Sequence, residues 1–148
     1  NFVSEGRIGR NRVTLLKPQT FMNDRGDAVQ QALRFYKLDV DALTAFHDEL
    51  DLAPMKVKVK QGGGTAGHNG LRSIGACLGP DFRRVRIRIG PSGPGQKEKV
   101  TPHVLGNYAK SEMEPLSDLL GAIAAEARWL ATGDDVRFMS DVALRLQQ

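Results

Sequence analysis

The order of apolar and polar residues along the chain predicts strands that alternate with helices. Two segments, Met55–Lys60 and Phe82–Ile89, alternate apolar and polar residues with a period of two, as strands with one buried face do. Arg12–Lys17, which Pro18 ends, and Leu43–His47 predict two further strands.

Four segments have apolar residues at the spacing of a helix. The first begins after a cap at Asn23 or Asp24 and reaches Tyr36, and the second and third cover Leu71–Leu78 and Glu112–Ala131. Gly133 ends the third, and the fourth begins after a cap at Asp134 or Asp135. On the last two helices, the residues expected to face the core are Met113, Leu116, Leu120, Ile123, Ala127, Leu130, Val136, Met139, Val142 and Leu146. Because strands alternate with helices, we expect an α/β layer fold with a mixed sheet, and the chain length predicts a single domain over residues 1–148.

The composition is that of an ordinary globular chain. Of its 148 residues, 41% are hydrophobic and 26% are charged. The one cysteine, Cys77, excludes a disulfide within the chain and fits a reducing, cytoplasmic setting. No apolar run approaches the roughly 18 residues of a membrane span.

Positive charge is concentrated in the middle of the chain. Residues 54–110 hold 11 Lys and Arg against 2 Asp and Glu, whereas residues 1–53 hold 7 against 8 and residues 111–148 hold 3 against 7. The two alternating segments supply two rows of cations, which are Lys56, Lys58, Lys60 and Arg84, Arg86, Arg88. Same-face neighbours lie about 6.6 Å apart, and such rows favour an anionic partner such as a nucleic-acid backbone. The alternatives are a solvated basic surface and lysines that protect a sheet edge.

A glycine-rich loop, Gly62–Gly70, lies between a predicted strand and a predicted helix. Such a loop lets backbone N–H groups approach a ligand, and this one contains the polar pair His68-Asn69. Its glycine spacing also matches a dinucleotide-binding loop, which keeps a nucleotide-dependent oxidoreductase as an alternative. The structural interpretation of Asn69 is an N-cap of the following helix.

Acidic residues follow the predicted strand Leu43–His47. A carboxylate at the carboxyl end of a strand, such as Asp48, can orient a histidine base and stabilise its charged form. A metal site that combines these carboxylates with a histidine is the alternative, although consecutive acids point in different directions. For Glu49 and Asp51 we expect loop solvation or capping.

Phe21-Met22-Asn23 precedes the first predicted helix. An aromatic residue and a methionine beside an amide can line an apolar pocket that has one polar contact. The alternative is that Phe21 and Met22 belong to the core.

Four of these motifs occur in the order seen in bacterial peptidyl-tRNA hydrolases, so the chain resembles that family from about Val13 to its C-terminus. They are Lys17-Pro18-Gln19-Thr20-Phe21-Met22-Asn23, His47-Asp48-Glu49-Leu50-Asp51, Gly62-Gly63-Gly64 with Gly67-His68-Asn69-Gly70-Leu71-Arg72-Ser73, and Phe82-Arg83-Arg84-Val85-Arg86-Ile87. The resemblance implies a single α/β domain with a mixed, twisted sheet flanked by helices. The implied activity is hydrolysis of the ester between a peptide and the 3′ end of tRNA, which recycles tRNA from aborted translation. It also implies a cytoplasmic monomer that needs no metal and no other cofactor.

The resemblance further implies a catalytic set and a substrate-binding set of residues. The catalytic residues, which place the attacking water or hydrogen-bond the histidine base, are Asn23, Asn69 and Asp48. The residues that bind the acceptor end of peptidyl-tRNA or its phosphates are Phe21, Met22, His68, Lys58 and Arg86.

The family's catalytic histidine is expected on a segment before Asn1, because His47, His68 and His103 lie outside its motif. We therefore interpret the chain as N-terminally incomplete, without its first strand and with little or no activity alone. A non-catalytic tRNA- or RNA-binding module is the second interpretation. An upstream sequence without a histidine-bearing segment would favour it.

The chain departs from the family pattern at three positions. Arg25 stands in place of a small hydroxyl residue, and Met55 and Arg88 each stand in place of a glycine. We expect these changes to alter loops and add charge without touching the site.

Overall fold

The computed structural model describes residues 2–49, 52–65, 68–88 and 110–147. The chain forms two compact units. Unit 1 comprises Asn1–Ala45 and Lys60–Arg84, and unit 2 comprises Phe46–Val59 and Val85–Gln148. Each unit has a hydrophobic core of its own.

The described strands form two sheets. β1 (Phe2–Ile8) and β2 (Asn11–Lys17) make an antiparallel hairpin, and the second sheet has the order β3-β5-β4, with β3 at Thr44–Asp48, β4 at Val57–Gln61 and β5 at Arg83–Ile87. β3 and β5 are parallel, because the residue numbers of their hydrogen-bonded partners rise together. β4 and β5 are antiparallel, because the residue numbers of their partners run in opposite directions. The donor–acceptor pairs are Arg83–Leu43 and Glu49–Ile87 for β3 with β5, and Met55–Arg88 and Gly62–Phe82 for β4 with β5. The sheet is therefore mixed, and the predicted α/β class with a mixed sheet is confirmed.

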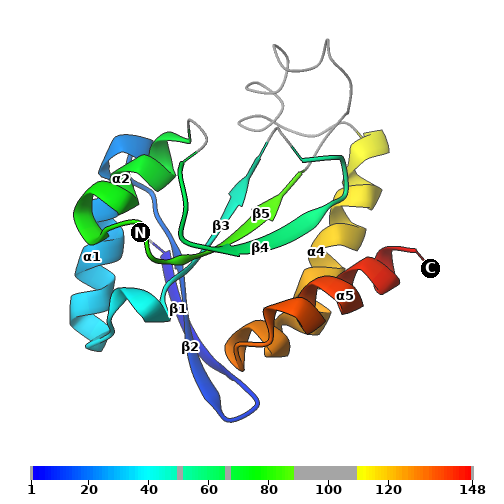
Figure 1. Ribbon diagram of the computed structural model, residues 1–148, viewed down its shortest axis with the longest axis horizontal. Coiled ribbons are helices and arrows are strands. Elements are labelled where there is room, and N and C mark those ends of the chain that lie inside the picture. Colours follow the sequence, from blue (N-terminus) through cyan, green and yellow to red (C-terminus); the bar gives the residue numbers. More distant parts are fainter. Residues whose placement is uncertain (1, 50–51, 66–67, 89–109, 148) are drawn as a thin grey trace. The chain divides into compact units, whose positions relative to one another are not determined.

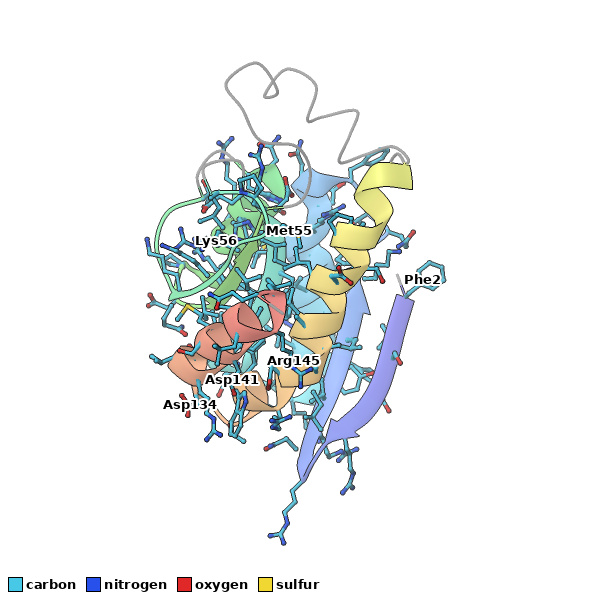
Figure 2. All side chains as sticks on the ribbon, turned by 90° about the vertical axis from the view of Figure 1, so that its right-hand side faces the viewer. Phe2, Met55, Lys56, Asp134, Asp141 and Arg145 are labelled. Carbon is cyan, nitrogen blue, oxygen red and sulfur yellow. The ribbon has the colours of Figure 1, made fainter. Side chains whose placement is uncertain are left out.

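Strand β1 was not predicted from the sequence. It pairs with β2 through a turn at Gly9, whose φ of +62° is left-handed and favours glycine. Nearly every residue of β1 is exposed, including Phe2 at 67% (Figure 2). A strand without a buried face lacks the apolar alternation by which strands are recognised.

Unit 1 is built around two packed helices, α1 (Arg25–Tyr36) and α2 (Asn69–Leu78) (Figure 1). The 3-10 helix η1 (Met22–Asp24) leads into α1, and η2 (Val40–Ala42) follows it. The buried core residues of this unit are Val29, Leu71, Ile74 and Phe82. A Cβ added at the buried Gly26 of α1 would lie 2.2 Å from the Ser73 carbonyl oxygen and 2.7 Å from the Cys77 Sγ, both on α2. The two helix backbones therefore approach as closely as a glycine permits.

Unit 2 contains α4 (Lys110–Ala131) and α5 (Asp135–Leu146), which pack with strand residues. Its buried core consists of Val85, Ile87, Leu119, Ala122, Ile123, Leu130, Phe138 and Val142. Two residues predicted to face the core are exposed instead: Leu120 at 48% and Val136 at 71%. The two adjacent leucines of α4 cannot both face inward, and spacing alone did not select the buried one.

The junction of α4 and α5 follows the sequence prediction. Gly133 has a φ of +84°, as a glycine that ends a helix often does. Asp134 is the N-cap of α5, and its side chain accepts a hydrogen bond from the Arg137 N–H at 3.1 Å.

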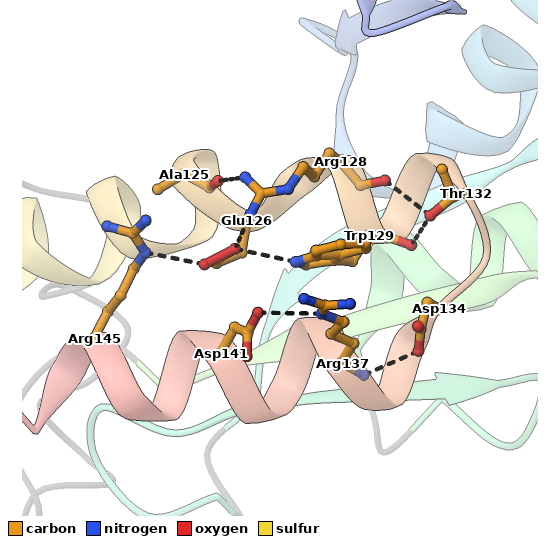
Figure 3. Close-up of polar contacts among 9 residues, drawn as sticks. All are labelled: Ala125, Glu126, Arg128, Trp129, Thr132, Asp134, Arg137, Asp141 and Arg145. Carbon is orange, nitrogen blue, oxygen red and sulfur yellow. Dashed lines mark hydrogen bonds and ion pairs between the residues drawn. The ribbon is translucent and has the colours of Figure 1, made fainter.

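A buried carboxylate links α4 to α5 (Figure 3). Glu126 of α4 is 5% exposed and accepts hydrogen bonds from Trp129 Nε1 and from Arg145 Nε of α5, both at 3.1 Å. Arg128 pairs with the same carboxylate at 3.4 Å. The guanidinium of Arg137, also on α5, lies 3.9 Å from the centre of the Trp129 ring. Charge and aromatic contacts thus join the two helices beside their apolar core.

We expect Gly26→Ala to destabilise the protein, because the new Cβ would overlap a backbone oxygen that cannot move alone. Overpacking of this kind costs about 1–3 kcal/mol. Gly121→Ala in α4 is the matched control: beyond its chain neighbours and the backbone of its own helix, no atom lies within 4 Å of its Cβ, and alanine favours a helix by up to roughly 1 kcal/mol. Urea titrations give the free energy of unfolding of both variants. Equal effects would contradict the close approach of α1 and α2.

The stabilising effect of Glu126 should depend on pH. Burial alone would raise the pKa of Glu126, but the hydrogen bond from Arg145, with the charge of Arg128, holds it below its ordinary value of 4.5. A lowered folded-state pKa stabilises the fold above about pH 4.5, and this contribution is lost as the pH falls through the folded-state pKa. Glu126→Gln should therefore be less stable than the wild type at neutral pH, and the two should converge in acid.

Denaturant titrations at a series of pH values measure this convergence. Asp118→Asn, which removes one negative charge from an exposed position on the same helix, is the control variant. A gap between wild type and Glu126→Gln that stays constant into strong acid would contradict the ionised pairing.

Candidate functional site

Two of the predicted site residues lie at the starts of the packed helices of unit 1. Asn69 is the first residue of α2, and Asn23 lies in η1, directly before α1. η1 contacts α2, and both asparagines are exposed. The structure thus brings together the elements that carry the two amides.

The N-cap of α2 is His68, not Asn69. Its ring Nδ1 accepts a hydrogen bond from the Leu71 N–H at 3.1 Å, so this nitrogen carries no proton in the capped form. A Cβ at Gly70 would lie 2.9 Å from His68 Cε1, so glycine there leaves room for the ring. The structural interpretation of Asn69 as an N-cap is therefore wrong, and His68 has a role in the helix start that the sequence did not reveal.

The start of the glycine-rich loop is held by Arg84, a buried cation that is 2% exposed. Its guanidinium donates hydrogen bonds to the carbonyl oxygens of Gly64 and of Pro80, the latter at 3.0 Å, and lies 4.3 Å from the centre of the Phe82 ring. Burial lowers the pKa of Arg84. Residues 66 and 67 of the loop lie outside the described part of the chain.

The arginine row of β5 is therefore not a solvent-facing row. Arg84 and Arg88 are buried, and Arg86 pairs with Glu49 at 3.1 Å, with side chains 25% and 12% exposed. The prediction of two exposed cationic rows is wrong for the arginines, because β5 is the central strand and is buried on both faces. The expectation that Glu49 is a solvated or capping residue is also wrong. Asp51, Ile89 and His103 lie outside the described residues.

The lysine row of β4 does match its prediction. Lys56, Lys58 and Lys60 are exposed, while Val57 and Val59 pack against the core of unit 2. The turn before this row contains Met55, labelled with Lys56 in Figure 2.

The three departures from the family pattern have visible structural settings. Met55 has a φ of +60°, a left-handed conformation that glycine adopts without strain, and its side chain packs against the core of unit 2. Arg88 is 4% exposed, and its N–H donates to the Lys56 carbonyl oxygen. Arg25 lies beside the start of α2, with its Cδ 3.5 Å from where a Cβ of Gly70 would be. The expectation that it leaves the site untouched stays a prediction.

Asp48 ends β3 in unit 2 and is half-buried. Its carbonyl oxygen accepts a hydrogen bond from Nδ1 of the buried His47 at 2.9 Å. Because a carbonyl can only accept, this Nδ1 carries the proton. Asp48 and the two asparagines are described in separate units of the chain.

Phe21 is 86% exposed, so the alternative that it is a core residue is wrong. Its carbonyl oxygen accepts the Asp24 N–H at 2.9 Å, which closes the turn of η1 in front of α1. The Met22 side chain lies outside the described part of the structure. An exposed aromatic ring two residues before Asn23 suits a contact with a ligand.

Ser73 is a site-adjacent residue that the sequence did not single out. Its hydroxyl accepts a hydrogen bond from the Gly26 N–H at 2.8 Å and donates one to the Asn23 carbonyl oxygen at 2.7 Å. Ser73 lies four residues after Asn69, on the same face of α2, and this spacing is the sequence feature that could have indicated a place beside the site.

The functional groups among the described residues are polar hydrogen-bond donors and carboxylates. Among them, no group of three His, Cys, Asp or Glu side chains is placed to hold a metal ion. None of the described helices has the length and apolar character needed to cross a membrane. Exposed amides at the N-terminal ends of helices are suited to an anion or a developing oxyanion, because the helix dipole adds to their own donors.

Comparison with known proteins identifies relatives over almost the whole chain. A peptidyl-tRNA hydrolase family model matches residues 1–148. The peptidyl-tRNA hydrolase of Sphingopyxis alaskensis is 68% identical over 146 residues, which are 99% of this chain and 76% of that protein. That of Novosphingobium aromaticivorans is 66% identical over 146 residues, 99% of this chain and 75% of that protein. The crystal structure of the peptidyl-tRNA hydrolase from Acinetobacter baumannii has a TM-score of 0.77 at 38% identity, covering 95% of this chain and 70% of that one.

These matches confirm the resemblance drawn from the four motifs and the α/β fold that it implied. The interpretation of residues 1–148 as an N-terminally incomplete domain, inactive alone, stays a prediction. Both the family model and the two relatives, each more than 60% identical, extend over nearly every residue. The chain therefore belongs to the peptidyl-tRNA hydrolase family.

Proposed function

We propose that this chain hydrolyses the ester bond between peptide and tRNA in peptidyl-tRNA, and so recycles tRNA from aborted translation. Family membership supports the activity. The structural observation that carries it is the placement of Asn23 and Asn69 on contacting elements at the starts of α1 and α2. Neither the core nor a helix cap accounts for these exposed amides, which makes them available to a substrate.

The proposed chemistry is general-base hydrolysis. The histidine base that the family resemblance implies takes a proton from water as the water attacks the ester carbonyl carbon. The bond to the tRNA 3′ oxygen then breaks, and this oxygen receives a proton as the peptide leaves with a carboxyl group. Asp48 orients the base and stabilises its protonated form, while Asn23 and Asn69 hold the water and the oxyanion.

Phe21 and His68 contribute to binding the acceptor end in this proposal. The exposed Phe21 ring supplies an apolar surface, on which a base or an apolar side chain of the peptide can stack. Met22 precedes Asn23 in the same 3-10 helix and is assigned to the same contact. His68 acts by keeping the first turn of α2 formed, which fixes Asn69 beside it.

Exposed cations bind the tRNA phosphates in this proposal. Lys58 lies in the middle of the exposed lysine row, so its ammonium is accessible to a backbone phosphate. Arg86 is paired with Glu49, and a phosphate would have to compete with that carboxylate. We therefore assign Lys58 the larger share of the salt-sensitive affinity. The protein is proposed to act as a monomer in the cytoplasm.

Asp48→Asn should lower turnover of peptidyl-tRNA by about tenfold or more, because an amide neither orients the histidine correctly nor stabilises its cation. The measurement is peptide release from a peptidyl-tRNA by the complete protein, with Asp41→Asn, a change of an exposed acid on η2, as the control. If Asp48→Asn stays within about a factor of two of the wild type, its orienting role is wrong. Tight tRNA binding by the wild type without any peptide release would instead favour a non-catalytic RNA-binding module.

Lys58→Gln should weaken tRNA binding in a salt-dependent manner. The slope of log affinity against log salt concentration is negative, and losing one phosphate contact makes it less steep by roughly 0.7–0.9. Arg34→Gln on α1 removes the same charge from an exposed position outside the lysine row and is the matched control. Titration of labelled tRNA at several salt concentrations gives both slopes, and identical slopes for the two variants would argue against a phosphate contact at Lys58.

A further inference from the structure

The first turn of α1 has no cap from its own sequence. Asp24 occupies the N-cap position, yet its side chain makes no capping hydrogen bond. The first N–H groups of a helix have no partner within the helix and need an acceptor from elsewhere. The Gly26 N–H donates to the Ser73 hydroxyl at 2.8 Å, so α1 is capped by a side chain from α2 that lies 47 residues further along the chain.

The same hydroxyl also fixes the residue before the helix. A serine hydroxyl has one proton to donate, and that of Ser73 goes to the Asn23 carbonyl oxygen at 2.7 Å. Ser73 therefore bridges two backbone groups on either side of Asp24. A shift of η1 against α2 would break one or both hydrogen bonds.

The packing around this bridge leaves little room for movement. A Cβ at Gly26 would lie 2.2 Å from the Ser73 carbonyl oxygen, so the backbones of α1 and α2 are in direct contact there. Asn69 lies four residues before Ser73 and hence on the same face of α2. The face that holds the Asn23 backbone thus also presents Asn69.

We infer that Ser73 is a positioning residue for the hydrolase reaction: its hydroxyl sets the place of Asn23 relative to Asn69. The inference rests on the proposed function, in which these two amides hold the attacking water and the oxyanion. Ser73 itself does not touch the reacting atoms. It acts through the backbone of Asn23, and its loss lets that backbone drift from the position that the transition state requires.

Ser73→Ala in the complete protein should lower kcat by roughly ten- to a hundredfold while KM changes by less than about threefold, because a misplaced amide costs transition-state stabilisation more than tRNA affinity. Cys77→Ala is the matched control. Cys77 lies one turn further along α2 and contacts Asp27 of α1 through its Sγ at 3.8 Å, but it has no contact with Asn23 among those described. An equal loss of kcat in Cys77→Ala and Ser73→Ala would mean that disturbed packing of α1 on α2 causes the effect, and it would overturn the inference.

A double-mutant cycle tests whether Ser73 acts through Asn23. If it does, Ser73→Ala should change kcat by less than about twofold in an Asn23→Ala background, although it still lowers the unfolding midpoint. If the loss of kcat in the double variant equals the product of the losses in the two single variants, the inference is overturned. Should Ser73→Ala fail to fold, Ser73→Cys supplies the same comparison, since a thiol of similar shape is only a weak donor.

The cycle also separates this inference from the proposed function. Loss of kcat in Asn23→Ala but not in Ser73→Ala overturns only the positioning role of Ser73. An unchanged kcat in Asn23→Ala removes the proposed role of Asn23, and the inference with it. Absence of peptide release by the wild-type complete protein overturns the proposed function itself.

Discussion

The burial of β5 on both faces is the constraint on which the rest of the structure depends. As the central strand of the sheet, β5 uses its backbone groups to pair with β3 and β4. Val85 and Ile87 on one face enter the core of unit 2, and Arg84 and Arg88 on the other face are buried as well. A buried cation must find acceptors, and Arg84 finds them in the carbonyl oxygens of Gly64, at the start of the glycine-rich loop, and of Pro80, which precedes β5. A requirement of the strand thus determines how the loop toward α2 is held.

The sequence predicted those strands and helices that have one buried face and one solvent-exposed face. The lysine row of β4 and the start of α5 at Asp134 or Asp135 followed from local spacing and cap chemistry alone, and the structure assigns the cap to Asp134. β1 escaped detection because its residues are exposed on both faces, so no apolar period exists to be read. On α4 the period was correct but its phase was not, since Leu119 and Leu120 are equally apolar and only the partner surface decides which is buried.

The candidate site shows the same division between local and distant causes. The motif residues around Asn23, Asp48 and Asn69 could be named from sequence, because their order and spacing are a property of the chain. The pairing of Arg86 with Glu49 joins residues 37 positions apart, and the bond from Ser73 to Asn23 joins residues 50 apart. Periodicity within one element carries no information about such contacts. For that reason the arginine row was interpreted as solvent-facing, and Ser73 was overlooked.

Asparagine is among the preferred N-cap residues, so an asparagine at a helix start is usually explained by the helix itself. That explanation fails at both helix starts of unit 1. At α2 the capping acceptor is the ring of His68, and at α1 it is the hydroxyl of Ser73 from the neighbouring helix. Helix stability therefore requires neither amide, and each can turn toward a substrate without unwinding the turn that carries it. The proposed function needs amides that are rigid in position and not committed to a helix cap, and capping by other residues provides both conditions.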